Sequence, residues 1–117
     1  MNLTDLNIHD SQILKVIEDS QNDTIDFILE YPIDYENNIF EKRKLIFYDF
    51  LNYNINEIPF AGIPTIIKIS EFKTKCYKVG VGKNEIEIVR NFVEFSTNCG
   101  LRTIEYKSVE LLKIDFE

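Results

Sequence analysis

One run of residues, His9-Asp10-Ser11, contains the residue types of a nucleophilic hydrolase. Such an enzyme needs a serine nucleophile, a histidine base and an acid that orients the base, all converging on one point. Three consecutive side chains diverge instead, and Asp10 and Ser11 are typical turn residues. His9 is the only histidine, so acid–base chemistry would depend on it or on a carboxylate with a shifted pKa. We therefore predict a turn here, no catalytic residues and no enzymatic activity.

Metal-ligand patterns are incomplete as well. The two cysteines, Cys76 and Cys99, fit no zinc spacing, and we expect them to be small apolar residues in or near the core. The segment from residue 19 to residue 30 places acids at the first, fifth and twelfth positions of a calcium loop. Thr24 occupies the sixth position, where such loops use glycine for a sharp turn. We predict neither a metal site nor a cofactor.

The charged residues are distributed unevenly along the chain. The formal net charge of −7 argues against nucleic acid as the partner, since backbone binding requires a cationic face. Val16–Glu41 contains no Lys or Arg and eight acidic residues, whereas Lys68–Lys83 contains five lysines and a single glutamate. We expect a surface with an acidic and a basic side.

Aromatic residues are interleaved with the acidic ones in the first of these segments. Carboxylates can steer a cationic partner, and aromatic rings can then anchor it by burial. We therefore propose a partner-binding surface, with a merely solubilising face as the alternative. Its predicted residues are Asp26, Glu30, Tyr31, Asp34, Tyr35, Glu36 and Phe40.

Length and composition predict one domain over residues 1–117. An apolar fraction of 44% suffices for a core. No apolar run approaches the roughly 18 residues that span a bilayer, and the N-terminal residues lack the basic and apolar regions of a signal peptide. We expect a cytoplasmic protein that does not bind membranes.

The hydrophobic pattern predicts mainly β-strands. Ser11–Asp19 and Thr24–Tyr31 form a predicted hairpin around a polar turn, because apolar and acidic residues alternate along the second strand. Glu41–Asp49 is a third strand, and Phe50–Ile58 either continues it or forms a fourth. Thr65–Phe72 fits a short helix as well as it fits a strand, since its apolar residues are three apart.

The closing stretch, Glu85–Phe116, predicts strands that fold back at the turn formed by residues 97–100. A helix over Glu85–Ser96 is the alternative, but the density of Ile, Val and Phe favours strands with a bend at Asn91. The apolar phase reverses near Ser108, which predicts a β-bulge or a strand that changes sheet. The core residues predicted from this stretch are Ile86, Ile88, Phe92, Phe95, Ile104 and Ile114.

The sum is an all-β, mainly antiparallel fold: a β-sandwich or half-open barrel of about seven to eight strands with at most one short helix. Two of its segments resemble small uncharacterised bacterial all-β families. The segment from Ile8 to Ile13 (IHDSQI) is similar to their "hydrophobic-His-Asp-small-x-Ile" opening. The segment from Val93 to Leu111 resembles their closing hairpin, in which Gly100 and Arg102 precede a final strand.

Several of these families are grouped with immunity proteins of bacterial toxin systems. The resemblance implies a non-enzymatic binder that blocks a cognate toxin, and it carries over no catalytic residues. We therefore expect a protein partner, such as a cationic toxin, with no prediction for the oligomeric state. The alternative is a small-ligand-binding β-domain whose pocket lies between the sheets and is lined by Tyr48, Tyr53, Phe60 or Tyr77.

Overall fold

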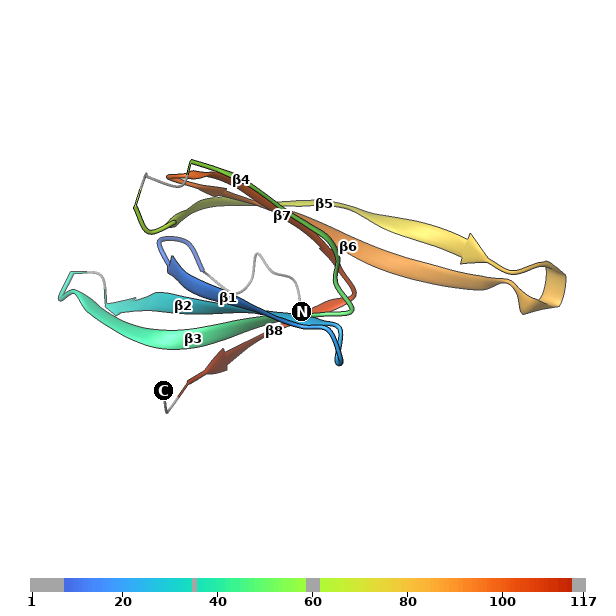
Figure 1. Cartoon of the computed structure of the whole chain (residues 1–117), viewed down its shortest axis with the longest axis horizontal. Helices are drawn as coiled ribbons and strands as arrows, with labels where there is room; N and C mark the ends of the chain where they lie inside the picture. The colour runs from blue at the N-terminus through green and yellow to red at the C-terminus, as the bar shows by residue number, and fades with distance from the viewer. Residues whose placement is uncertain (1–7, 35, 59–61, 115–117) are drawn as a thin grey trace.

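The computed structural model describes residues 8–34, 36–58 and 62–114, except for the side chains of residues 72–77. Two four-stranded antiparallel sheets face each other, with strand orders β1-β2-β3-β8 and β4-β7-β6-β5 (Figure 1). The strands are β1 (Gln12–Asp19), β2 (Thr24–Asp34), β3 (Ile39–Tyr48), β4 (Leu51–Glu57), β5 (Ile66–Val79), β6 (Ile86–Thr97), β7 (Gly100–Tyr106) and β8 (Ser108–Lys113). The predicted all-β sandwich is confirmed.

The predicted β1–β2 hairpin is present and is closed by an acidic side chain. The Asp19 carboxylate accepts hydrogen bonds from the backbone N–H of Gln21 (3.0 Å) and from the side-chain amide of Asn22 (2.8 Å). The Asp19 side chain therefore stabilises the turn that follows it, and the chain enters β2 at Thr24. Because residues 24–30 are strand, the calcium-loop pattern has no structural counterpart.

Two short connections, from β3 to β4 and from β7 to β8, carry the chain directly from one sheet into the other. The chain leaves β3 in the first sheet and enters β4 in the second after the bend at Asp49 and Phe50. It returns at Lys107, where β7 of the second sheet gives way to β8 of the first. The Lys107 N–H donates to the Tyr48 carbonyl (3.0 Å), and the Asn91 side-chain amide donates to the Lys107 carbonyl (2.9 Å). The predicted phase reversal at Ser108 is therefore a change of sheet.

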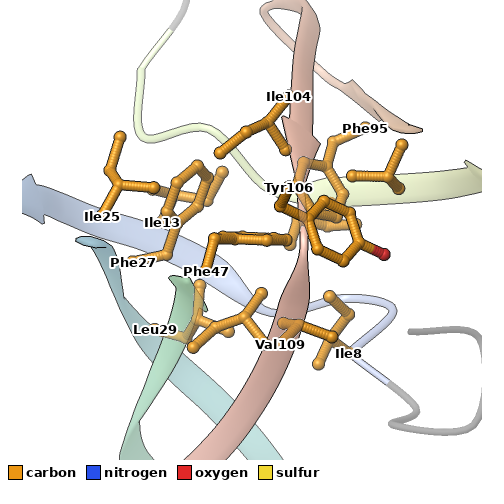
Figure 2. Packing of buried hydrophobic residues seen from close by; sticks show 13 residues of the cluster. Ile8, Ile13, Ile25, Phe27, Leu29, Phe47, Phe95, Ile104, Tyr106 and Val109 are labelled. Carbon is orange, nitrogen blue, oxygen red and sulfur yellow. The ribbon is translucent and has the colours of Figure 1, made fainter. Parts of the chain in front are cut away.

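The core lies between the sheets and is built around aromatic rings (Figure 2). Phe27 and Phe47 of the first sheet meet edge to face at 5.4 Å between ring centroids. Phe47 also contacts Tyr106 (4.9 Å) and Phe95 (6.1 Å) of the second sheet. These rings span the two layers, so the core belongs to neither sheet alone.

The two sheets are also joined at one edge. The Ile13 N–H donates to the Pro64 carbonyl (2.7 Å), and the Ile66 N–H donates to the Ser11 carbonyl (2.9 Å). An isolated bridge between Gln12 and Thr65 continues this contact. The edge strands β1 and β5 thus meet over a short distance, which partly closes the sandwich.

Both segments that admitted a helical interpretation are strands. Thr65–Phe72 lies largely within β5, and Glu85–Ser96 lies largely within β6. The predicted bend at Asn91 is wrong, because β6 is one uninterrupted strand of 12 residues. In the part of the chain that the structure describes, the one helical element is the single turn η2 (Gly82–Asn84).

The predicted core residues of the closing stretch differ in burial. Phe95 and Ile104 are fully buried, whereas Ile86 and Ile88 are 63% and 41% exposed. The prediction for these two is wrong because the β5–β6 hairpin extends past the end of the sandwich, where no second sheet covers it (Figure 1). Phe92 and Ile114 are half-buried.

Candidate partner-binding surface

A concave surface lies where the start of β1 approaches the β2–β3 hairpin. This cleft has a volume of about 470 Å³ and is lined by Asp10, Gln12, Glu30, Asn38, Phe40 and Thr65. Gln12 of β1 pairs with Glu30 of β2, and Phe40 lies on the neighbouring strand β3. Gln12 also bridges to Thr65, which precedes β5. The cleft therefore combines two carboxylates, several uncharged polar groups and one aromatic ring.

Two of the seven predicted residues, Glu30 and Phe40, lie together in this cleft. Asp10, which was expected only to form a turn, lines it as well. Its backbone N–H donates to the Ile66 carbonyl (2.8 Å), and its positive φ of 69° fixes the turn. The sequence indicated the turn correctly, but the hydrogen bond that holds Asp10 at the cleft is accepted by Ile66, in a distant part of the chain.

His9 lies beside Asp10 at the molecular surface. Its Nδ1 is 2.8 Å from the Asp10 carboxylate, and its side chain is 54% exposed. Ser11 is fully buried and separated from solvent. The three residues of the triad-like run thus have different environments, as expected for a turn.

At the tip of the β2–β3 hairpin, Asp34 stabilises the turn. The Asp34 carboxylate accepts hydrogen bonds from the Asn37 side-chain amide (2.6 Å) and backbone N–H (3.2 Å). These hydrogen bonds, the one from the side chain first, lower the pKa of Asp34 below its ordinary value. Glu36 is exposed beside it. Tyr35 lies outside the described residues.

Asp26 and Tyr31 lie away from the cleft. Asp26 is on β2 with Lys44 at 3.9 Å, and burial raises its pKa although the Lys44 charge opposes this. The Tyr31 side chain packs against the core, and the Arg43 guanidinium lies over its ring at 4.1 Å. The seven predicted residues therefore do not form one continuous patch.

A second polar cluster lies among β4, β6 and β7 and is largely buried. Arg102 donates to both carboxylate oxygens of Glu57 (2.8 Å each) and to the Tyr53 hydroxyl (3.1 Å). The Thr97 hydroxyl donates to the same carboxylate (3.1 Å). Because these groups satisfy one another, the cluster ties β4, β6 and β7 together and presents no open position for a ligand.

The tyrosines of the predicted ligand pocket are dispersed. Tyr53 packs against Phe27 in the core at 5.5 Å between centroids. Tyr48 lies on the opposite face of β3 from the buried Phe47, and its hydroxyl donates to Glu110 (2.7 Å). Phe60 and the Tyr77 side chain lie outside the described part of the structure.

Among the side chains that the structure describes, no three His, Cys, Asp or Glu residues are grouped so that they could hold a metal ion. The described residues also include no helix long and apolar enough to cross a membrane. The side chains that line the cleft offer charge, hydrogen-bonding groups and an aromatic ring.

No family model matches the sequence, and no curated protein matches it significantly. The function proposed below therefore depends on the geometry of the cleft.

Proposed function

We propose that this protein is a non-enzymatic, cytoplasmic protein-binding module, and that the cleft between β1 and the β2–β3 hairpin receives a cationic side chain of its partner. The observation that carries the proposal is the convergence of Asp10, Glu30 and Phe40 on one concave surface. Two carboxylates attract a lysine or arginine, and the Phe40 ring offers an apolar contact for its aliphatic stem. Gln12, Asn38 and Thr65 add hydrogen-bonding groups.

The acidic residues outside the cleft support this role at longer range. Glu36 is exposed and Asp34 is half-buried at the hairpin tip, and hydrogen bonds lower the pKa of Asp34 and so stabilise its charged form. Acidic groups grouped around a binding surface raise the rate at which a basic partner arrives, and salt screens the effect. The proposed partner is therefore a protein with a basic surface, and an immunity-type role against a cationic toxin is the specific form of the proposal.

Charge reversal in the cleft tests it. The tagged protein is used to capture partners from a lysate of the source organism, and Glu30→Lys is compared with Glu18→Lys. Glu18 is an exposed acid on β1 outside the cleft, so the control changes the net charge equally. We expect Glu30→Lys to weaken capture of the basic partner at least about tenfold, because like charges in contact cost several kcal/mol. Equal capture by both variants would overturn the assignment of the cleft.

The immunity-type form has its own test. If a gene beside the coding sequence encodes a toxin, co-expression of the wild-type protein should restore growth. Glu18→Lys should also restore it, and Glu30→Lys should not. Growth arrest in the presence of the folded wild-type protein would exclude immunity to that toxin while leaving the cleft as a protein-binding surface.

A further inference from the structure

The distal part of the β5–β6 hairpin, residues Lys78–Val89, is here called the arm. The pairing of β6 with β7 ends at Asn91 and Tyr106, whereas the pairing of β5 with β6 continues to Val79 and Ile86. Beyond Asn91 the hairpin is thus a two-stranded ribbon that projects along the long axis of the molecule (Figure 1). Its tip is the η2 turn.

The arm exposes more apolar surface than an isolated ribbon is expected to carry. Its exposed aliphatic side chains are Val79 (53%), Val81 (87%), Ile86 (63%), Ile88 (41%) and Val89 (48%). A two-stranded hairpin is marginally stable in water on its own, and open strand edges beside apolar side chains favour association with another chain. These residues are therefore suited to an interface.

A groove at the base of the arm supplies a surface of matching character. It has a volume of about 520 Å³ and is lined by Leu51, Asn52, Val79, Ile88, Arg90 and Glu105. The charged groups in its wall already interact with each other, with Arg90 Nε 3.5 Å from a Glu105 carboxylate oxygen. Arg90 also donates to the Asp49 carbonyl. The groove consequently suits an aliphatic side chain better than an ion.

The same chain thus presents an apolar projection, with Val81 at its tip, and an apolar groove a few residue pairs away. Charge identifies the partner that fits both. The arm contains two lysines and two glutamates and is neutral, while the whole chain has a net charge of −7. Two copies of an acidic protein repel each other least where both surfaces are neutral, and the arm's opposite charges can pair across a two-fold axis.

We propose that the arm is a homodimerisation element: two copies pack their arms together antiparallel, and Val81 of each copy enters the groove of the other. This interface buries the exposed aliphatic residues and covers the open edges of both ribbons. It lies at the end of the molecule formed by the β5–β6 hairpin, separate from the cleft beside the β2–β3 hairpin, so one dimer would present two partner-binding clefts.

Oligomeric state tests the proposal directly. Light scattering after size-exclusion chromatography, over a hundredfold range of concentration, should show a dimer for the wild type. Ile88→Asp places a charge in the groove and should raise the dimer dissociation constant by about 30-fold or more, as a central interface residue does. Ile55→Asp is the matched control, since Ile55 is similarly exposed (54%) but lies on β4 away from the arm. A monomeric wild type, or equal dimerisation of both variants, would overturn the proposal.

A crosslinking experiment covers the case in which Ile88→Asp fails to fold. A photoreactive residue at Val81 is introduced into unlabelled protein, which is mixed with ¹⁵N-labelled wild type. We expect crosslinks from position 81 to labelled peptides that contain Leu51 or Ile88. Crosslinks confined to the same copy, or to labelled peptides of the β2–β3 hairpin, would refute the antiparallel arrangement.

Discussion

Gly100 begins β7 at a point where β4 passes too close for any side chain. Its φ is +149°, and a Cβ built on it would lie 2.2 Å from the Asn56 carbonyl oxygen and 3.0 Å from the Glu57 Cα. These obstructing atoms belong to backbone, which cannot move aside as a flexible side chain can. The absence of a side chain at position 100 therefore allows β4 to pair with β7 and to present Glu57 to Arg102.

Gly100→Ala should destabilise the protein by about 1–3 kcal/mol or more, because strain in the backbone adds to a steric overlap. Urea unfolding measures the loss. Gly62→Ala is the control: its φ is also positive (+95°), but a Cβ there would meet nothing within 4 Å. If both variants lost the same stability, conformational strain alone would account for Gly100 and the close approach of β4 would contribute nothing.

The Glu57–Arg102 pair should make the stability of the native state depend on pH. Burial by itself would raise the pKa of Glu57, but hydrogen bonds from Arg102, its charge and the Thr97 hydroxyl outweigh burial and lower the pKa below 4.5. A carboxyl whose pKa is lowered by folding stabilises the native state above its unfolded pKa. That contribution disappears as the pH falls through the folded pKa.

Glu57→Gln should accordingly cost about 3 kcal/mol at neutral pH, because Arg102 then remains buried without a counter-charge. The difference between wild type and variant should shrink as the pH is lowered below 4.5 and the wild-type carboxyl takes up a proton. Urea unfolding at a series of pH values provides the comparison, with the exposed Glu18→Gln as control. A difference that stayed constant on acidification would show that the charge of Glu57 is not its stabilising feature.

At the scale of the elements, alternation in the sequence predicted most strands correctly. In β2 the alternating residues Ile25, Phe27 and Leu29 are all buried, and the predicted start at Thr24 is the observed one. The reversal of phase at Ser108 correctly indicated the change of sheet. Where every second side chain enters one core, a single sequence contains enough information to define a strand.

The ambiguity in β5 has a physical cause. A register shift between Ile66 and Lys68 inserts one residue into the strand. Ile66 and Ile69, which are three apart, therefore both pack toward the core, and this spacing imitates a helix. A bulge is set by the partner strand, so the sequence of β5 alone could not distinguish the two structures.

The arm and the candidate site were missed for a related reason. Ile86 and Ile88 alternate as core residues do, and they are exposed because the β5–β6 hairpin extends beyond the opposite sheet (Figure 1). In the site, alternation along β2 already separates Glu30 from Tyr31, which the sequence prediction placed together. Asp10 is held at the cleft by the hydrogen bond of its backbone N–H to the Ile66 carbonyl, and no local pattern encodes that contact.

At the scale of the whole molecule, connectivity makes the two sheets one cooperative unit. The strand pairs β3–β4 and β7–β8 each run from one sheet into the other, and Phe47 contacts rings from both layers. Neither sheet can lose its structure without exposing the inner face of the other and breaking both connections. Unfolding should therefore be two-state.

Phe47→Ala tests this expectation, since it removes the ring that contacts both sheets and should cost about 3–5 kcal/mol. Far-UV circular dichroism and tyrosine fluorescence should report one transition that shifts equally in both signals. Native-state hydrogen exchange should show that the substitution lowers the opening free energies of the slowest amides in β2 and β6 by the same amount. Ile58→Ala, at a position 66% exposed, should change stability by less than about 0.5 kcal/mol. A loss of protection confined to β2 would mean that the sheets unfold separately, and that the sheet-crossing strands do not couple the cleft end of the molecule to the arm.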